Sequence, residues 1–478
     1  MNPNPSLLAR LAEEAMVKHG FLPHPPPEAL AEANARQAAT TADGARDLCG
    51  LAWTSIDNPE SRDLDQIEAV EKADGGIKLY VGIADVERYV PVGSANDGFA
   101  AHNTTSVYTG VRTFPMLPER FSFDLTSLVA DQKRFAVVIE TLISPEGEVK
   151  NGKVYAALVL NRAKLDYPSV SAWLDGKAAA PARLAASPEL SAQIKLQDEL
   201  ARILAAARKR AGALDVETSE LRLVADEHGG VRELKAHQQD RAGGIIEELM
   251  IASNQAVAAD LDARGRPSIR RVVKEPEHWD RIVAYARERG GKLPAAPSVL
   301  ELSRFVEAMR SARPAQFAEI SLALIKMIGR GEYVAHLPGA AEVGHFGLAT
   351  QRYTHATAPN RRYIDLVMQR IVKGSRPYTA TELSVIAARC TQFESEAQKV
   401  ERQVHKSAAA LLIRSRVGES FDGIVTGAGD KGTFVRVVDP PVEGKIIMGE
   451  RGLKVGDKAR VRLHDVNVEK GFIDFQIV

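Results

Sequence analysis

The chain is organised around one acidic stretch, residues 56–67. It reads Ile56-Asp57-Asn58-Pro59-Glu60-Ser61-Arg62-Asp63-Leu64-Asp65-Gln66-Ile67. Pro59 and its polar neighbours predict a loop between two extended runs. Asp63 and Asp65 are two residues apart, so on a strand they would project from the same face. A loop can fold Asp57 back toward them.

Three carboxylates that converge would repel one another unless a cation neutralised them. Hard oxygen ligands of this kind suit Mg²⁺ or Mn²⁺. The stretch therefore indicates a candidate metal site formed by Asp57, Asp63 and Asp65. Spacing alone leaves a second interpretation open, because acidic solvated turns are common on protein surfaces.

The composition is that of an ordinary globular protein. The chain has 478 residues, 45% hydrophobic and 26% charged, and 62 Lys and Arg balance 62 Asp and Glu. This length predicts roughly two to four domains, and zero net charge neither demands nor excludes a polyanionic partner. Cys49 and Cys390 are the only cysteines, which excludes a disulfide framework and a multi-cysteine zinc site. With no signal segment and no long apolar run, we expect a soluble cytoplasmic protein without membrane contact.

Hydrophobic patterning predicts two parts before the C-terminal segment. Residues 1–46 carry two short helical runs, separated by prolines. Two interpretations of them stay open: a small helix-turn-helix module, or an arm docked on the main domain. Residues 47–412 begin β-rich and turn helical from about residue 243, which predicts one large α+β unit. Its last helix is expected at residues 393–416, highly charged with a narrow apolar stripe.

Residues 417–478 predict an all-β barrel. Five short strands with Gly- and Pro-rich turns are typical of an OB-fold. Glycines 427, 429 and 432 match G-x-G-x-x-G, but a strand follows instead of a helix, which excludes a dinucleotide site. Phe434 and Phe421 either stack on nucleic-acid bases or fill the barrel.

Several further stretches of the central part join the acidic run. They are Ser106-Val107-Tyr108, Lys164-Leu165-Asp166-Tyr167, residues 209–215, 245–254, 344–348 and 353–366. In this order and spacing they resemble the RNB catalytic domain of the exoribonuclease II family, which includes RNase II and RNase R. The resemblance covers residues 47–412 and recurs in at least six blocks. The pattern of residues 417–478 resembles an S1 RNA-binding domain.

The resemblance implies metal-dependent hydrolysis of single-stranded RNA from its 3′ end, with release of 5′-mononucleotides. The cofactor implied is Mg²⁺, with Mn²⁺ as its substitute. The positions that match catalytic residues are Asp57, Asp63, Asp65 and Arg361, the last at the scissile phosphate. The positions that match metal ligands are Asp57, Asp63, Asp65 and Gln66.

The resemblance also implies a set of RNA-binding residues. Tyr108 and Tyr167 match aromatic residues that pack on bases near the 3′ end. Either Glu247 or Glu248 matches a carboxylate at the terminal nucleotide. Arg362 and Phe434 complete the expected set.

Gln66 departs from the family pattern, in which two adjacent aspartates end the acidic loop. A glutamine carbonyl still ligates Mg²⁺, but one negative charge is gone. The leading hypothesis is therefore an active exoribonuclease that is divergent at this position. The alternatives are a catalytically degenerate RNA-binding protein of the same fold, and a structural protein that docks through residues 1–46 in an RNA-decay assembly.

Overall fold

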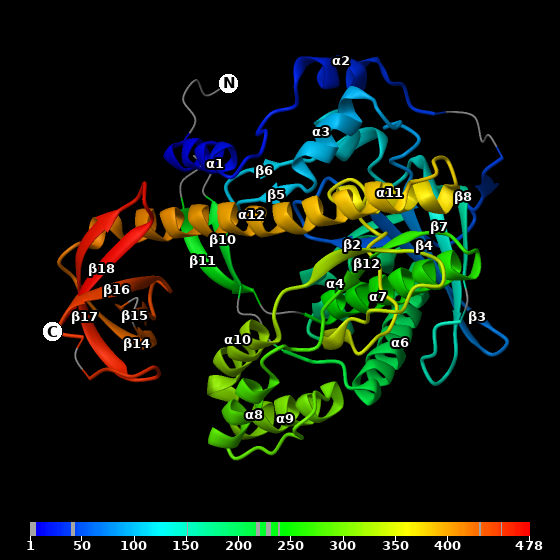
Figure 1. The fold of residues 1–478 in the computed structure, drawn as a ribbon. Helices are drawn as coiled ribbons and strands as arrows, with labels where there is room; N and C mark the ends of the chain where they lie inside the picture. The colour runs from blue at the N-terminus through cyan, green and yellow to red at the C-terminus, as the bar shows by residue number, and fades with distance from the viewer. Residues whose placement is uncertain are drawn as a thin grey trace.

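The computed structural model describes residues 6–39, 44–150, 152–216, 220–225, 231–237, 240–429, 432–450 and 452–478. Its largest element is a seven-stranded mixed sheet in the order β1-β8-β7-β4-β3-β2-β9 (Figure 1). The strands are β1 (Arg46–Asp47), β2 (Thr54–Asp57), β3 (Gln66–Ala73), β4 (Gly76–Ala84), β7 (Lys133–Ile143), β8 (Lys153–Leu160) and β9 (Ala163–Asp166). Strands β3, β4, β7 and β8 form one antiparallel ladder, and β9 runs parallel to β2.

Two long helices pack on this sheet and against each other, α6 (Pro188–Ala211) and α7 (Arg241–Ala263). The Ser187 side chain caps α6 by accepting the N–H of Leu190, and Gly212 ends the helix with φ +92°. Asp240 caps α7 in the same way, through the N–H of Gly243.

Shorter elements complete the central part. The helices are α3 (Ala95–Asn103), α4 (Tyr167–Leu174), α5 (Ala182–Ala185), α11 (Tyr363–Lys373), the π-turn η1 (Phe121–Leu125) and the 3₁₀ turns η2 (Pro314–Gln316), η3 (Phe346–Leu348) and η4 (Arg414–Arg416). The strand pairs are β5 (Val107–Tyr108) with β6 (Thr113–Phe114), β10 (Glu220–Ala225) with β11 (Val231–His237), and β12 (Ser268–Val272) with β13 (Glu332–His336). A helical lobe of α8 (Trp279–Glu288), α9 (Val299–Ala312) and α10 (Phe317–Ile328) has its own apolar core.

The longest helix, α12 (Ala380–Ile413), links the central part to the barrel (Figure 1). It begins earlier than the helix expected at residues 393–416, because Thr379 and Glu382 form a capping box. Its charged faces with a narrow apolar stripe suit a helix that crosses between two parts of the protein. No described helix is long and apolar enough to cross a membrane.

The N-terminal helices pack on the rest of the chain. α1 (Leu7–Lys18) lies along α12, and α2 (Pro27–Ala35) packs on α3. The apolar face of α1 is buried, and Phe21 behind it meets Phe393 of α12 edge-on at 5.0 Å. Each helix thus uses its apolar face against the main domain, which is the docking-arm arrangement and not a paired helix-turn-helix.

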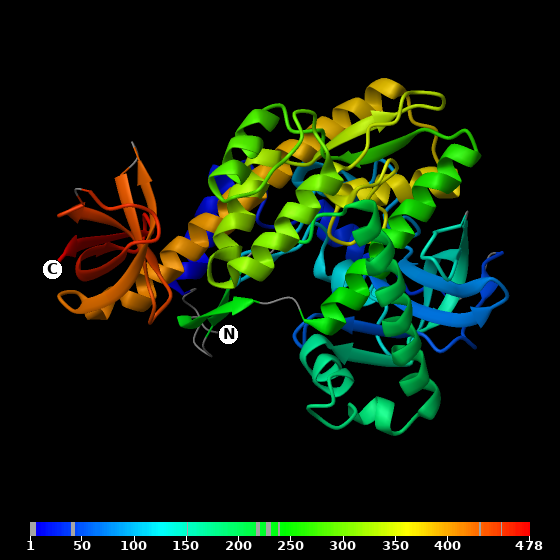
Figure 2. The same ribbon diagram turned by 90° about the horizontal axis from the view of Figure 1, so that it is seen from below.

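The C-terminal part forms the closed five-stranded barrel that the sequence predicts, in the order β14-β15-β16-β18-β17. The strands are β14 (Ser420–Gly429), β15 (Gly432–Val437), β16 (Glu443–Met448), β17 (Lys458–Asn467) and β18 (Phe472–Ile477). Phe421 is 6% exposed and packs against Phe475 inside the barrel, so it is a core residue and not a stacking platform. Figure 2 shows the barrel standing apart from the large sheet, beyond the end of α12.

Candidate active site

The acidic loop, residues 57–66, joins the end of β2 to the start of β3. The N–H of Asn58 and the hydroxyl of Ser61 both donate to Asp57 Oδ1, at 2.7 and 2.9 Å. From β9, the Lys164 ammonium donates to the carbonyl oxygen of Ser61 at 2.5 Å. Internal and external hydrogen bonds therefore hold the loop in one conformation.

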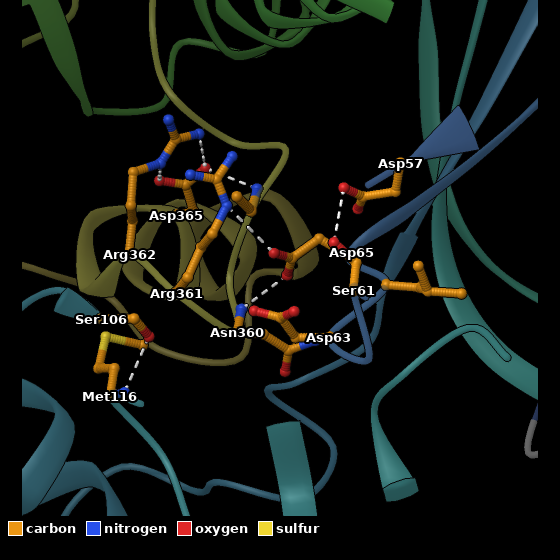
Figure 3. A network of polar contacts seen from close by, with 12 residues as sticks. Asp57, Ser61, Asp63, Asp65, Ser106, Met116, Asn360, Arg361, Arg362 and Asp365 are labelled. Carbon is orange, nitrogen blue, oxygen red and sulfur yellow. Dashed lines mark hydrogen bonds and ion pairs between the residues drawn. The ribbon is translucent and has the colours of Figure 1, made fainter. Parts of the chain in front are cut away.

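Asp65 is the point where the acidic loop meets the arginine loop, residues 354–362 (Figure 3). Its Oδ1 accepts the N–H of Asn360 at 2.9 Å, across 295 residues of chain, and its Oδ2 lies 3.4 Å from Nε of Arg361. The residue is 2% exposed. Burial raises the pKa of Asp65 to about 7, against the opposing charge of Arg361 and with the added repulsion of Asp63.

The two adjacent arginines of the arginine loop have different partners. Arg362 donates through Nε and Nη2 to Asp365, at 2.8 and 2.7 Å, and the same carboxylate accepts the N–H of Ala358. Arg361 keeps 44% of its side chain exposed beside Asp65. The arginine aimed at the acidic loop is therefore Arg361, whereas the Arg362 guanidinium forms a bidentate ion pair within the arginine loop and α11.

Tyr108 reaches the acidic loop from a third segment, strand β5. Its hydroxyl donates to Asp63 Oδ2 at 2.8 Å, and the residue is 40% exposed. The N–H of Ser106, two residues earlier, donates to the carbonyl of Arg361 at 2.9 Å. Figure 3 shows how these segments converge on the same small volume.

Tyr167 stands beside Asp57 because of the sheet register. Strands β2 and β9 pair in parallel with Asp57 opposite Asp166, and Tyr167 follows as the first residue of α4. The Asp166 side chain accepts the N–H of Ser169 and so caps α4. Burial first, and then the charge of Asp57, raises the pKa of the Tyr167 hydroxyl.

The two carboxylates at the start of α7 differ in their surroundings. Arg208 of α6 donates to both oxygens of Glu248, at 2.9 Å to Oε2 and 2.5 Å to Oε1. Glu248 keeps 8% of its side chain exposed, and Glu247 keeps 42%. Arg208 Nη2 also lies 3.3 Å from Glu247 Oε1, but Glu247 is the more exposed of the two and is therefore the carboxylate that a ligand can reach.

The structure does not bring every predicted residue to this site. Phe434 lies on β15 of the barrel, at the far end of α12 (Figure 1), and is half-buried. Gln66 is the first residue of β3 and is also half-buried, next to Asp65. Phe434 therefore belongs to a separate surface, and Gln66 to the acidic loop.

Two residues that shape this site were not predicted from the sequence to belong to it. Lys164, which donates to the Ser61 carbonyl, lies in a stretch from which only Tyr167 was expected at the site. Asn360 acts through its backbone N–H, a group that every residue but proline carries, so its side-chain type gave no signal.

A second polar cluster contains Asp262, His336 and Glu342. Among the described residues, these form the one group of three potential metal ligands whose ligand atoms lie within 4.8 Å of one another. Arg270, 1% exposed, lies 2.5 Å from Asp262, and Arg352 lies 3.3 Å from Glu342. Two arginines thus neutralise the two carboxylates, so we interpret these five residues as an ion-pair network, the balanced cluster, and not as a metal site.

The donor chemistry of the acidic loop fits a hard divalent cation. Asp57, Asp63 and Asp65 offer carboxylate oxygens, and Gln66 adds an amide carbonyl. Among the described residues, Arg361 is the one arginine paired with them, and it carries one positive charge. An excess of negative charge remains, which a divalent cation would neutralise.

Comparisons with known proteins agree with this architecture. Residues 45–375 match the RNB domain, and residues 419–478 match the RNase II-type exonuclease C-terminal S1 domain. Ribonuclease R of Thermotoga maritima is 30% identical over 97% of this chain and 70% of its own length. Ribonuclease R 1 of Lactococcus lactis is 29% identical over 88% of this chain and 55% of its own length. The chain thus spans 55% and 70% of the length of these two relatives.

Two solved structures show the same fold. Mycoplasma genitalium RNase R in complex with ribose-methylated single-stranded RNA superposes with a TM-score of 0.88 at 23% identity, over 99% of this chain and 79% of that one. Yeast Ssd1, described as a pseudonuclease, has a TM-score of 0.72 at 17% identity, over 96% of this chain and 57% of that one. With the RNB match over residues 45–375 and the barrel match behind it, the chain belongs to the RNB family and carries an RNase II-type S1 domain at its C-terminus.

Proposed function

We propose that this chain is a divalent-metal-dependent exoribonuclease that hydrolyses single-stranded RNA from the 3′ end and releases 5′-mononucleotides. The observation that carries the proposal is the meeting of Asp65 with Arg361. A buried carboxylate in an acidic loop and an exposed guanidinium lie 3.4 Å apart, although 296 residues separate them in the chain. Carboxylates that hold a cation and an arginine that binds a phosphate are groups that suit metal-dependent phosphodiester hydrolysis.

In the proposed reaction, a water oxygen attacks the last phosphorus and the bond from that phosphorus to the 3′ oxygen of the penultimate nucleotide breaks. The released nucleotide carries the 5′-phosphate, and the shortened RNA ends in a 3′-hydroxyl. Asp57, Asp63, Asp65 and Gln66 would hold Mg²⁺ or Mn²⁺. When bound, the cations would activate the water and stabilise the leaving oxygen. Arg361 would donate its planar N–H fork to the scissile phosphate as charge develops there.

Three side chains around the acidic loop are suited to hold the 3′ end. Tyr108 is exposed, and Tyr167 is half-buried beside Asp57; each would pack on a base without reading its identity, a contact worth roughly 1–3 kcal/mol per base. Glu247, exposed at the start of α7, is the carboxylate that would reach the terminal nucleotide. Glu248 instead positions α7 through Arg208.

The barrel would act as an outer handle for longer RNA. Phe434 projects from β15 opposite Gly427, where the absence of a side chain leaves one face of the ring accessible. Arg436 and Lys445 are exposed on the same strand and on its neighbour β16. Stacking and phosphate contacts of this kind are sequence-tolerant. Arg362 would support the arginine loop through Asp365 and so contribute to RNA binding indirectly.

A second function, RNA binding without cleavage, is favoured by one observation. Gln66 removes a carboxylate from the acidic loop. The third hypothesis, docking in an assembly through residues 1–46, has less support, because α1 buries its apolar residues against this chain's own α12 and barrel.

The decisive experiment follows 5′-labelled single-stranded RNA in the presence of Mg²⁺ and then EDTA. We expect products that shorten from the 3′ end only with metal, and no shortening by the Asp65→Asn variant. Asp74→Asn is the matched control, because Asp74 is an exposed aspartate in the turn that follows β3 and Asn-Gly preserves that turn. Retained RNA binding with no shortening by the wild-type protein would overturn the proposal in favour of the second function.

A further inference from the structure

Glu68 is a buried carboxylic acid for which the proposed mechanism has no role. It lies on β3, two residues after Gln66, and its exposure is 0%. Its backbone carbonyl accepts from Gln197 and Thr54, but neither carboxylate oxygen has a hydrogen-bond partner. An unpaired buried carboxylate is costly, so a group of this kind either stays neutral or receives a cation.

The strand geometry directs Glu68 toward the acidic loop. Successive side chains of a strand alternate between faces, so Glu68 shares a face of β3 with Gln66. Strand β2 pairs with β3 only at Thr54 and Glu68, and beyond that pair the acidic loop opens between the two strands. Glu68 therefore lies where β2 and β3 are still paired. Beyond it the two strands separate, with Asp57 on β2 and Gln66 on β3.

The sheet register brings the same groups together. Strand β2 pairs on one edge with β9, where Asp57 lies opposite Asp166 and Tyr167 follows. On its other edge β2 pairs with β3 at Glu68. Asp57 and Glu68 thus lie on neighbouring strands, and a cation between two such carboxylates would remove the repulsion between their negative charges.

The amide at Gln66 indicates a role for Glu68. The acidic loop presents three carboxylates and one amide where the family pattern has a fourth carboxylate, and Glu68 is a fourth carboxylate on the same strand face. We propose that Glu68 supplies the negative charge that Gln66 lacks and helps Asp57 to hold the divalent cation. The proposal rests on the metal site of the proposed function and adds to it a residue outside the acidic loop.

The test measures Mn²⁺ binding to the RNA-free protein by calorimetric titration, after removal of metal with EDTA. We expect Glu68→Gln to weaken Mn²⁺ binding by roughly 10- to 100-fold, as the loss of a supporting carboxylate at a metal site does. Glu71→Gln is the matched control, because Glu71 is an exposed glutamate on the same strand, and it should bind Mn²⁺ like the wild type. Thermal unfolding in EDTA checks that each variant folds.

A compensating pair sharpens the test. Glu68→Leu should lose affinity for Mn²⁺, and adding Gln66→Asp in the double variant should restore most of it, because the carboxylate returns at the neighbouring position. Unchanged Mn²⁺ affinity in Glu68→Gln, or a double variant no better than Glu68→Leu, would overturn the proposal.

The experiments distinguish a failure of the Glu68 proposal from a failure of the nuclease proposal. If wild-type protein shortens RNA and Glu68→Gln binds Mn²⁺ normally, Glu68 is only a core residue and the nuclease proposal stands. If Mn²⁺ affinity depends on Glu68 but the wild-type protein never shortens RNA, the metal ligand is correct and the nuclease proposal is wrong.

Discussion

Two acidic clusters of this molecule use the same residue types to opposite effect. The balanced cluster sets Asp262 and Glu342 against Arg270 and Arg352, so its formal charges cancel within the protein. The acidic loop sets three aspartates against Arg361 alone, which is half-exposed. The formal charges of the first arrangement cancel, whereas the second carries an excess of negative charge that the proposed cation would neutralise.

The proposed metal site is not the cluster with the most closely packed ligand atoms. The balanced cluster has the tighter geometry, with its ligand atoms within 4.8 Å of one another. It nevertheless has no charge left for a metal. The acidic loop is proposed instead for its net negative charge and for the raised pKa of Asp65.

The largest expected effect is on the rate of RNA shortening, which should depend on the acidic loop and not on the balanced cluster. Asp65→Asn keeps the shape of the side chain but removes its charge, so the rate of RNA shortening should fall at least ~100-fold with RNA affinity nearly unchanged. Asp262→Asn should leave the rate within about twofold of wild type at a temperature where it is folded. Single-turnover cleavage and filter binding measure the two quantities. Comparable losses of rate in both variants would erase the distinction between the clusters.

The second effect is on the free energy of unfolding, which should depend on the balanced cluster more than on the acidic loop. Asp262→Asn leaves the buried guanidinium of Arg270 with only its longer contact to Glu342, at 3.9 Å, so it should lower the free energy of unfolding by ~3 kcal/mol. Asp65→Asn should not destabilise the metal-free protein, because it relieves repulsion with Asp63. Urea unfolding in EDTA gives both values. A destabilised Asp65→Asn variant would mean that Asp65 is chiefly structural.

The sequence predicted the parts of this picture that are local. The acidic loop followed from Pro59 and the spacing of three aspartates, and the barrel followed from five short strands with turn residues. Long-range partners left no local signal: Arg208 of another helix pairs with both Glu248 and Glu247, and two arginines balance Asp262 and Glu342 through the fold alone. The early start of α12 was readable in the capping box of Thr379, but the charged composition of the helix obscured it.

A smaller effect is expected at Tyr108, which is proposed to pack on RNA and donates to Asp63 of the acidic loop. Its hydroxyl orients Asp63 while leaving other lone pairs of that carboxylate available. Tyr108→Phe should keep the stacking ring, so RNA affinity should hold, while half-maximal activity should need roughly threefold to tenfold more Mg²⁺. Tyr108→Ala should lose RNA affinity as well. If the Phe variant has a normal Mg²⁺ requirement, the hydroxyl does not position Asp63.

The smallest effect concerns His345, on the segment between Glu342 of the balanced cluster and Arg361 of the arginine loop. Burial first, and then the charge of Arg271, lowers the pKa of His345 to about 4, and its Nδ1 accepts the N–H of Leu348 at 3.1 Å. An unfolded histidine takes up a proton near pH 6.5. Between pH 6.5 and 4, His345 therefore binds a proton in the unfolded chain but not in the folded protein. The free energy of unfolding consequently falls as pH falls.

In His345→Asn, the amide oxygen can accept the same N–H, as cap residues do, but it cannot be protonated. The slope of unfolding free energy against pH should then become shallower by up to ~1.4 kcal/mol per pH unit, the value for one proton, between pH 6 and 4.5. Urea unfolding at several pH values measures the slope, and cleavage at pH 7.5 should be unaffected because the wild-type imidazole is already neutral there. An identical slope in the two proteins would assign the acid sensitivity to other groups, and a cleavage defect at pH 7.5 would show that the ring itself supports the arginine loop.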